Sequence, residues 1–191
     1  MSQPERTPEI ASGALVAALS EPGPARQQAW SMLVARYSHR MYAVARSFHV
    51  DEGTAEDLVQ TAWLRLLERR DQLRDSDAVG AWLCTIVRNE ARRVVTRRRE
   101  IPSVLGLENS PDGRDPVESG LIRDERSRAL RSAFVQLGEE CQRLLRLLLV
   151  EPAMSYDEIA AAVGRPRGSL GPTRRRCLDS LRTHLPPSFG P

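Results

Sequence analysis

The chain has 191 residues, of which 41% are hydrophobic and only 5% aromatic, and its formal net charge is +3. Ala, Leu, Arg and Glu are abundant and strand-forming residues are sparse, which favours an all-helical protein of one or two domains. No segment approaches the apolar length of a membrane helix, so we expect a soluble, cytoplasmic protein without membrane insertion.

Residue types that support catalysis or metal binding are scattered. The three cysteines, Cys84, Cys141 and Cys177, are far apart and none lies at metal-ligand spacing from another cysteine or from a histidine. Each falls in an apolar periodic stretch, so we expect small buried thiols in a reducing compartment. No Cys/His dyad, catalytic carboxylate pair or phosphate-binding loop is recognisable. We therefore expect no catalytic residue, no metal, no cofactor and no enzymatic activity.

The N-terminal half reads as a series of helices. Residues 1–24 form a polar lead with one short apolar stretch, Ile10–Leu19, that can form a helix. From Ala25 apolar residues recur at three- and four-residue steps, as on an amphipathic helix. Thr54 is the expected N-cap of the next helix, which ends near Arg69. A further helix is expected from about Val79 to Arg99, so residues 25–100 form one helical domain.

The second half begins with a change of character. Residues 101–120 contain three prolines and four acidic residues against one arginine, which predicts a flexible acidic linker. Helices are expected to resume near Leu121, and apolar residues from Phe134 to Leu148 share one face of a helix that Glu151-Pro152 ends. Ser155 and Glu158 then form a capping box, and Gly164 turns the chain. A last helix is expected to end near Leu185, which gives a second domain at 121–185 and a tail at 186–191.

The capping box, the run of alanines, the turn glycine and the basic second helix together predict a helix-turn-helix that binds DNA. The alternative is a helical hairpin with a basic solvated face. Prolines in the second helix lie near its start, where N–H groups are unpaired. We expect an irregular first turn, regular helix from about Thr173, Leu170, Cys177, Leu178 and Leu181 inward, and Arg174 and Arg175 outward.

Two further surfaces lie in the N-terminal half. Six arginines occur in residues 88–99 against one glutamate, which favours nucleic-acid binding over a merely solvated helix end. Arg88, Asn89, Arg92, Arg93 and Thr96 share the expected outer face. The other surface suits a protein partner, although alone it would be an ordinary solvated face. Its residues recur at helical spacing: Asp57, Gln60, Thr61 and Leu64.

Three stretches, in this order along the chain, carry a resemblance to a known family. They are A-E-D-L-V-Q-T-A-W-L-R-L-L (55–67), G-A-W-L-C-T-I-V-R-N-E-A-R-R (80–93) and Y-D-E-I-A-A-A-V-G-R-P-R-G-S-L-G-P-T-R-R-R-C-L-D-S-L-R (156–182). The chain thereby resembles the sigma-70 family of bacterial RNA polymerase initiation factors, in its extracytoplasmic-function (ECF, group 4) type. The resemblance implies an all-α fold with two small helical domains, a sigma-2-like bundle and a sigma-4-like helix-turn-helix. It covers roughly residues 25–100 and 121–185.

The resemblance also implies roles for these residues. A core-polymerase surface would comprise Asp57, Gln60, Thr61 and Leu64. The promoter −10 element would be contacted by Arg88, Asn89, Arg92, Arg93, Thr96 and Arg97, with Trp82 as support and residues 75–79 beside a flipped base. The −35 element would be contacted by Arg165, Arg167, Ser169, Thr173, Arg174 and Arg175. Partners would be core RNA polymerase, promoter DNA and an anti-sigma factor. Many relatives carry an acidic residue where Arg93 stands, so a −10 sequence preference does not transfer.

The alternative function is a helix-turn-helix regulator that binds DNA without acting as a polymerase subunit. Such a regulator normally carries a receiver, ligand-binding or dimerisation module. Residues 1–120 contain no recognisable module of that kind, and the surface around Asp57 and Gln60 would have no role in it. We therefore favour the initiation factor.

Overall fold

The computed structural model describes residues 10–100 and 121–186, and these form helices, with no strand among them. The expected all-α class is confirmed. The helices are α1 (Ser12–Ala18), α2 (Pro24–Arg46), α3 (Glu52–Arg69), α4 (Val79–Glu100), α5 (Leu121–Val135), α6 (Glu139–Leu147), α7 (Tyr156–Val163) and α8 (Leu170–Thr183). Short 3₁₀ turns are η1 (Arg70–Gln72), η2 (Ser76–Ala78) and η3 (Arg167–Ser169). The expected linker at 101–120 and parts of both ends, 1–9 and 187–191, lie outside the described residues.

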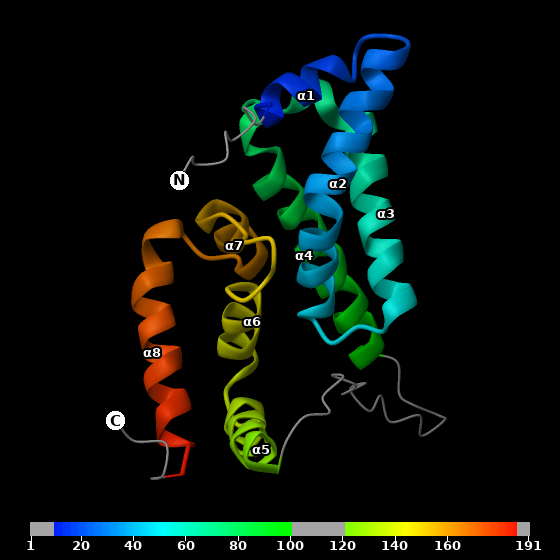
Figure 1. The fold of residues 1–191 in the computed structure, drawn as a ribbon. Coiled ribbons are helices and arrows are strands. Elements are labelled where there is room, and N and C mark those ends of the chain that lie inside the picture. Colours follow the sequence, from blue (N-terminus) through cyan, green and yellow to red (C-terminus); the bar gives the residue numbers. More distant parts are fainter. Residues whose placement is uncertain (1–9, 101–120, 187–191) are drawn as a thin grey trace, which may run out of the picture.

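Helices α1–α4 form what we call the N-terminal bundle, in which α2, α3 and α4 pack on one another and α1 crosses one end (Figure 1). Fully buried aliphatic side chains such as Leu33, Leu66 and Leu83 fill its centre. The start of α3 differs from our prediction, because Asp51 rather than Thr54 is the N-cap. The Asp51 carboxylate accepts hydrogen bonds from both the backbone N–H (2.8 Å) and the hydroxyl (2.9 Å) of Thr54, so Thr54 supports the cap from inside the helix.

Helices α5–α8 form what we call the C-terminal unit. Our prediction that one helix carries the apolar face from Phe134 to Leu148 is wrong, because the chain breaks between α5 and α6. Gly138 is the N-cap of α6, and the buried Gln142 side chain donates hydrogen bonds to the backbone carbonyls of Val135 (3.1 Å) and Leu137 (2.7 Å). This amide satisfies the orphan carbonyls at the end of α5, so the apolar periodicity continues across a real break.

The helix-turn-helix is confirmed as α7, η3 and α8. Ser155 and Glu158 form the capping box, and Gly164 ends α7 in the left-handed region at φ 75°. The irregular first turn is η3, and regular helix begins at Leu170, three residues before the predicted start. Pro172 is thus the third residue of α8, a position whose N–H has no partner within the helix, and so it does not interrupt the hydrogen-bond ladder.

The cysteines differ from our prediction of three thiols. Cys141 of α6 and Cys177 of α8 form a disulfide with their Cα atoms 5.3 Å apart, whereas Cys84 of α4 is free and buried. Burial raises the pKa of the Cys84 thiol, which keeps it protonated. Apolar periodicity placed Cys177 inward correctly, but no sequence pattern indicated that Cys141 would lie opposite it.

The two groups of helices are in contact. Helix α7 packs along α4, and the buried apolar side chains of both groups belong to one continuous cluster. Helix α8 lies on the side of α6 and α7 away from the N-terminal bundle (Figure 1). The two DNA-facing helices expected from the sequence are therefore held differently, one at the centre of the molecule and one at its edge.

Candidate functional site

An apolar groove of about 660 Å³ opens between α2 and α3. Trp30 and Trp63 meet edge to face in it, with ring centroids 5.1 Å apart, and the Trp63 indole N–H donates to the Ser38 hydroxyl at 3.3 Å. Leu64 and Leu67 line the α3 side and are 53% and 41% exposed. Exposed leucines beside aromatic rings form an apolar surface of the kind that marks a protein-binding site.

The predicted α3 surface borders this groove. Gln60 and Leu64 line it, and Asp57 lies exposed on the same helix, one turn before Gln60. Thr61 is partly exposed and does not line the groove. The α2 side of the groove, with Trp30, Val34 and Tyr42, was absent from our predicted site. Their helical periodicity is that of ordinary core residues, and no sequence signal distinguishes a core residue from one that lines a groove.

The basic end of α4 presents a partly occupied surface. Asn89, Arg92, Arg93, Thr96 and Arg97 are exposed, as expected for a nucleic-acid-binding face. Three guanidinium groups on this helix are engaged within the protein. The first, on Arg93, donates to Glu90 at 2.7 Å, and the second, on Arg98, donates to Asp51 at 2.7 Å.

The third engaged guanidinium, on Arg88, donates to the side-chain oxygen of Asn89 at 2.9 Å and lies against Gly164 at the turn of the helix-turn-helix. Arg88 is also only partly exposed, so it does not lie freely on the outer face as predicted. The arrangement leaves Arg92 and Arg97 without an ion-pair partner among the described residues. These two are the arginines of α4 most available to phosphate.

The surface of α8 and its preceding turn also mixes engaged and free arginines. Arg165 donates to both carboxylate oxygens of Glu140, one of them at 2.8 Å, and Arg167 donates to Asp157 at 3.0 Å. Arg174 and Arg175 are exposed and, within the described part of the chain, form no ion pair. Both point away from the disulfide side of the helix, as predicted.

Two other predicted residues of this surface are placed differently from each other. Ser169 is exposed at its start, and its hydroxyl donates to the Pro166 carbonyl at 2.7 Å. Thr173 is only 5% exposed, so our prediction that it faces outward is wrong. Its hydroxyl accepts a hydrogen bond from Arg176 at 3.3 Å, and helical periodicity places it beside Leu170 and Cys177 on the inner face.

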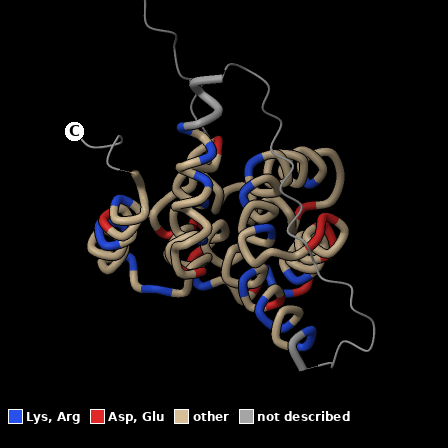
Figure 2. Tube along the Cα trace, turned by 90° about the horizontal axis from the view of Figure 1, so that it is seen from below, with Lys and Arg blue, Asp and Glu red and all other residues tan. Residues whose placement is uncertain are grey.

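Arginines are spread over both groups of helices and alternate with acidic positions (Figure 2). Among the described residues, none of the helices has the length and apolarity to cross a membrane. Because the arginines are so widely distributed, charge alone does not delimit a DNA surface on this protein. The exposed arginines without a protein partner delimit a candidate surface better.

Comparison with known proteins connects these surfaces to a family. The family described as Sigma-70 region 2 matches residues 33–101. The chain is 27% identical over 170 residues to the ECF RNA polymerase sigma-E factor of Escherichia coli K12, with 84% of this chain and 88% of that protein covered. It is 30% identical over 155 residues to the ECF RNA polymerase sigma factor EcfG of Rhodopseudomonas palustris, with 81% and 82% covered. The chain belongs to the ECF sigma factor family.

Solved structures agree with this fold. CnrH in complex with the cytosolic domain of CnrY matches with a TM-score of 0.58 and 24% identity, over 91% of this chain and 96% of that chain. The sigma factor RpoE in complex with the anti-sigma factor NepR from Bartonella quintana matches with a TM-score of 0.58 and 22% identity, over 81% and 95%. This ECF sigma factor thus has the same helical architecture over most of its length.

Proposed function

We propose that this ECF sigma factor binds bacterial core RNA polymerase and directs it to promoters by recognising their −10 and −35 elements. Residues 25–100 would form the domain that binds core polymerase and the −10 element, 101–120 the linker, and 121–185 the −35 domain. The protein would act in the cytoplasm and without catalytic activity of its own. One observation carries the proposal: a single chain joins an exposed apolar groove to two helices with exposed, unengaged arginines.

The groove between α2 and α3 is the proposed polymerase-binding site. Gln60 and Leu64 line it, and Asp57 and Thr61 extend it along α3. A partner helix with apolar side chains would bury the two exposed leucines against Trp30 and Trp63, while Asp57 and Gln60 would fix its orientation through polar contacts at the rim. Such a division between an apolar centre and a polar rim is typical of protein interfaces.

The −10 and −35 surfaces are proposed from exposure and charge. On α4, Arg92 and Arg97 would hold the phosphates of the melted strand, and Asn89 would contact a base, as in other single-strand-binding sites. On α8, Arg174 and Arg175 lie one turn from its N-terminus, the part of a recognition helix that enters the major groove. Thr173 is not included, because its side chain is buried.

An anti-sigma factor is the proposed regulatory partner. RpoE of Bartonella quintana, whose fold is similar, was solved in complex with the anti-sigma factor NepR. The exposed apolar groove supports the same kind of partner here, since a competitor that covers Leu64 and Leu67 would prevent polymerase binding.

Run-off transcription with purified core RNA polymerase and a genomic promoter library tests the proposed function. We expect initiation at a defined subset of promoters only when this protein is added. Failure to direct initiation from any promoter would contradict the function as an initiation factor and leave the DNA-binding regulator as the better description.

The Asp57→Ala/Gln60→Ala variant tests the polymerase-binding site. We expect weaker binding to core polymerase with unchanged binding to duplex DNA, because these residues lie far from α8. The matched control is Glu21→Ala/Gln28→Ala, which removes an exposed carboxylate and an exposed amide away from the groove. Equal loss of polymerase binding in the control, or loss of DNA binding in the test variant, would contradict the assignment.

A further inference from the structure

The disulfide between Cys141 and Cys177 encloses the whole helix-turn-helix. The two cysteines are separated by 36 positions in the sequence, and α7, the turn at Gly164 and the first half of α8 lie between them. Arg174 and Arg175 also lie inside this covalent loop, and Arg174 precedes Cys177 by about one turn of α8. The bond therefore fixes α8 close to the turn that carries its exposed arginines.

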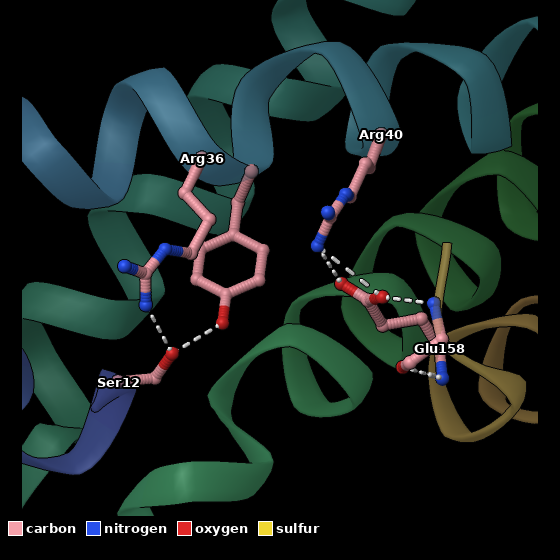
Figure 3. Close-up of polar contacts among 6 residues, drawn as sticks. Ser12, Arg36, Arg40 and Glu158 are labelled. Atoms are coloured by element: carbon pink, nitrogen blue, oxygen red, sulfur yellow. Dashed lines mark hydrogen bonds and ion pairs between the residues drawn. The ribbon is translucent and has the colours of Figure 1, made fainter. Parts of the chain in front are cut away.

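The two helices of the helix-turn-helix are held by different interactions. In α7, Glu158 accepts a hydrogen bond from Arg40 of α2 at 3.1 Å and another from the Ser155 backbone N–H at 2.6 Å (Figure 3). The Glu158 side chain is only 4% exposed, so a buried ion pair holds α7 in place. In α8, by contrast, the side chains of Arg176 and Arg182 hydrogen-bond within the helix itself. Apolar packing and the disulfide are what hold α8 on α6 in the described part of the chain.

The surroundings of Cys141 suit thiol–disulfide exchange. Cys141 is partly exposed whereas Cys177 is only 1% exposed, so a reagent in solution reaches the Cys141 sulfur first. Cys141 is also the third residue of α6, where the N–H groups and the dipole of a helix favour an anion. Arg165 and Arg143 hold the pKa of the adjacent Glu140 carboxyl below its ordinary value, so positive charge gathers here. These features favour a thiolate at Cys141, the form that attacks a disulfide.

The third cysteine of the chain has the opposite surroundings. Cys84 lies in α4, is only 1% exposed and is not bonded to another cysteine. Burial raises the pKa of its thiol, so it stays protonated and unreactive. Exchange is therefore confined to the pair that joins α6 to α8.

The compartment gives this pair its meaning, a step that rests on the proposed function. A protein that acts on polymerase and promoter DNA works in the cytoplasm, where glutathione and thioredoxin keep thiols reduced. A disulfide that forms there is usually transient and redox-sensing, not a permanent structural bond. The pair is therefore expected to be a dithiol under reducing conditions and a disulfide after oxidation.

We propose that Cys141 and Cys177 form a redox switch that controls DNA binding by α8. The oxidant is a low-molecular-weight disulfide. The Cys141 thiolate attacks one of its sulfur atoms and releases a first small thiol, and Cys177 then attacks the Cys141 sulfur and releases the second. The protein thiols lose two electrons and two protons, and the small disulfide takes up both as it becomes two thiols. Oxidation holds α8 on α6 with Arg174 and Arg175 outward, and reduction releases α8 from this position.

Thiol alkylation with mass spectrometry measures the switch in the full-length protein without DNA or polymerase. The protein is equilibrated in mixtures of reduced and oxidised glutathione, quenched with acid, unfolded and alkylated. We expect Cys141 and Cys177 to be labelled at the reducing end and protected at the oxidising end, while Cys84 is labelled throughout as the internal reference. A pair that stays oxidised in every mixture, or reduced in every mixture, would overturn the switch.

Fluorescence anisotropy with a labelled random-sequence DNA duplex tests whether the switch controls α8. If reduction leaves α8 in place in about 10% of molecules, apparent binding by α8 weakens by up to ~10-fold. Cys141→Ala/Cys177→Ala should bind as weakly as reduced wild type and should not respond to oxidised glutathione. Cys84→Ala is the matched control and should keep the full response.

The two exposed arginines show whether the response comes from α8. Arg174→Ala/Arg175→Ala should bind the duplex weakly and lose most of the difference between its oxidised and reduced forms. Equal DNA binding by oxidised and reduced wild type, or a full response in the arginine variant, would overturn control of α8 by the cysteine pair. Because neither assay uses polymerase or a promoter, the switch is judged separately from run-off transcription, whose failure would count against the proposed function alone.

Discussion

The two arginine-rich helices carry similar composition but are held in different ways. Helix α4 is central, packed against α2, α3 and α7, and several of its arginines bind groups within the protein. Helix α8 lies at the edge, packs chiefly on α6, and is joined to it by the Cys141–Cys177 disulfide. Its exposed pair, Arg174 and Arg175, has no ion-pair partner among the described residues.

This difference teaches that a count of arginines does not define a DNA surface. On α4 part of the positive charge is engaged within the protein, because Arg93 donates to Glu90 and Arg98 donates to Asp51. On α8 the unengaged pair is available at once, and a covalent bond fixes the helix that presents it. The proposed −35 surface therefore presents two unengaged arginines, whereas the proposed −10 surface mixes engaged and unengaged ones.

Loss of the disulfide should have the largest effect and should act on only one of the two helices. Closing a loop of this length constrains the unfolded chain by about 4 kcal/mol, an upper value because engineered and natural bonds often give less. We expect a reductant to weaken amide-exchange protection in α6 and α8 while α2 and α3 keep theirs, as followed by hydrogen–deuterium exchange and mass spectrometry.

The Cys141→Ala/Cys177→Ala variant is the control for reductant effects elsewhere, and its exchange pattern should not respond to reductant. Equal protection of α8 in wild-type protein with and without reductant would show that packing alone holds the helix. The difference between α8, held by a covalent bond, and α4, held by packing alone, would then disappear.

The next effect concerns the unengaged pair on α8. Arg174→Ala should weaken binding to a cognate −35 duplex by about 1–3 kcal/mol, or roughly 5- to 150-fold, if Arg174 reads a guanine. Arg182→Ala is the control, because Arg182 lies in the last turn and is paired with Asp179 at 2.8 Å. Titration by fluorescence anisotropy measures both, and similar losses in the two variants would remove Arg174 from the recognition surface.

Much of the fold could be predicted because it is encoded locally. The capping box at Ser155 and Glu158, the turn at Gly164 and the inward face of α8 all follow from short-range rules, and each is confirmed. The errors lie where a distant or competing side chain determines where a helix begins or ends. Asp51, not Thr54, is the N-cap of α3. Gln142 stabilises the end of α5, which the continuous apolar periodicity of the sequence did not reveal.

The candidate site was predictable in its exposed polar part and not in its buried or paired part. Spacing identified the face that contains Gln60 and Leu64, but not the contribution of Trp30 from a second helix. Charge identified the arginines, but their engagement with Gly164 or Glu140 depends on tertiary contacts between residues far apart in the chain. Periodicity places Thr173 on the inner face of α8 with Leu170 and Cys177, although it is next to the exposed arginines in the sequence.

The smallest expected effect concerns pH and the contact between α6 and the end of α2 at His49. Burial lowers the pKa of His49, and the charges of Arg146, Arg143 and Arg46 lower it further, against an opposing effect of Glu139. The hydrogen bond from Arg146 requires a neutral ring, because a protonated imidazole has no acceptor. The contact between α6 and the end of α2 therefore disfavours the protonated form of this side chain.

The sign of the pH dependence follows from that preference. Since His49 has a lower pKa in the folded protein than its ordinary value of 6.5, the unfolded chain binds more protons below pH 6.5. The stability that this contact contributes should be fully present above pH 6.5 and should be lost as the pH falls toward the lowered pKa. Thermal unfolding should give a slightly lower Tm at pH 5.5 than at pH 7.5, and His49→Asn should reduce this difference, since asparagine does not titrate and tolerates the left-handed backbone at φ 58°. Persistence of the same pH response in His49→Asn, with His39→Asn as the exposed control, would assign it to another group.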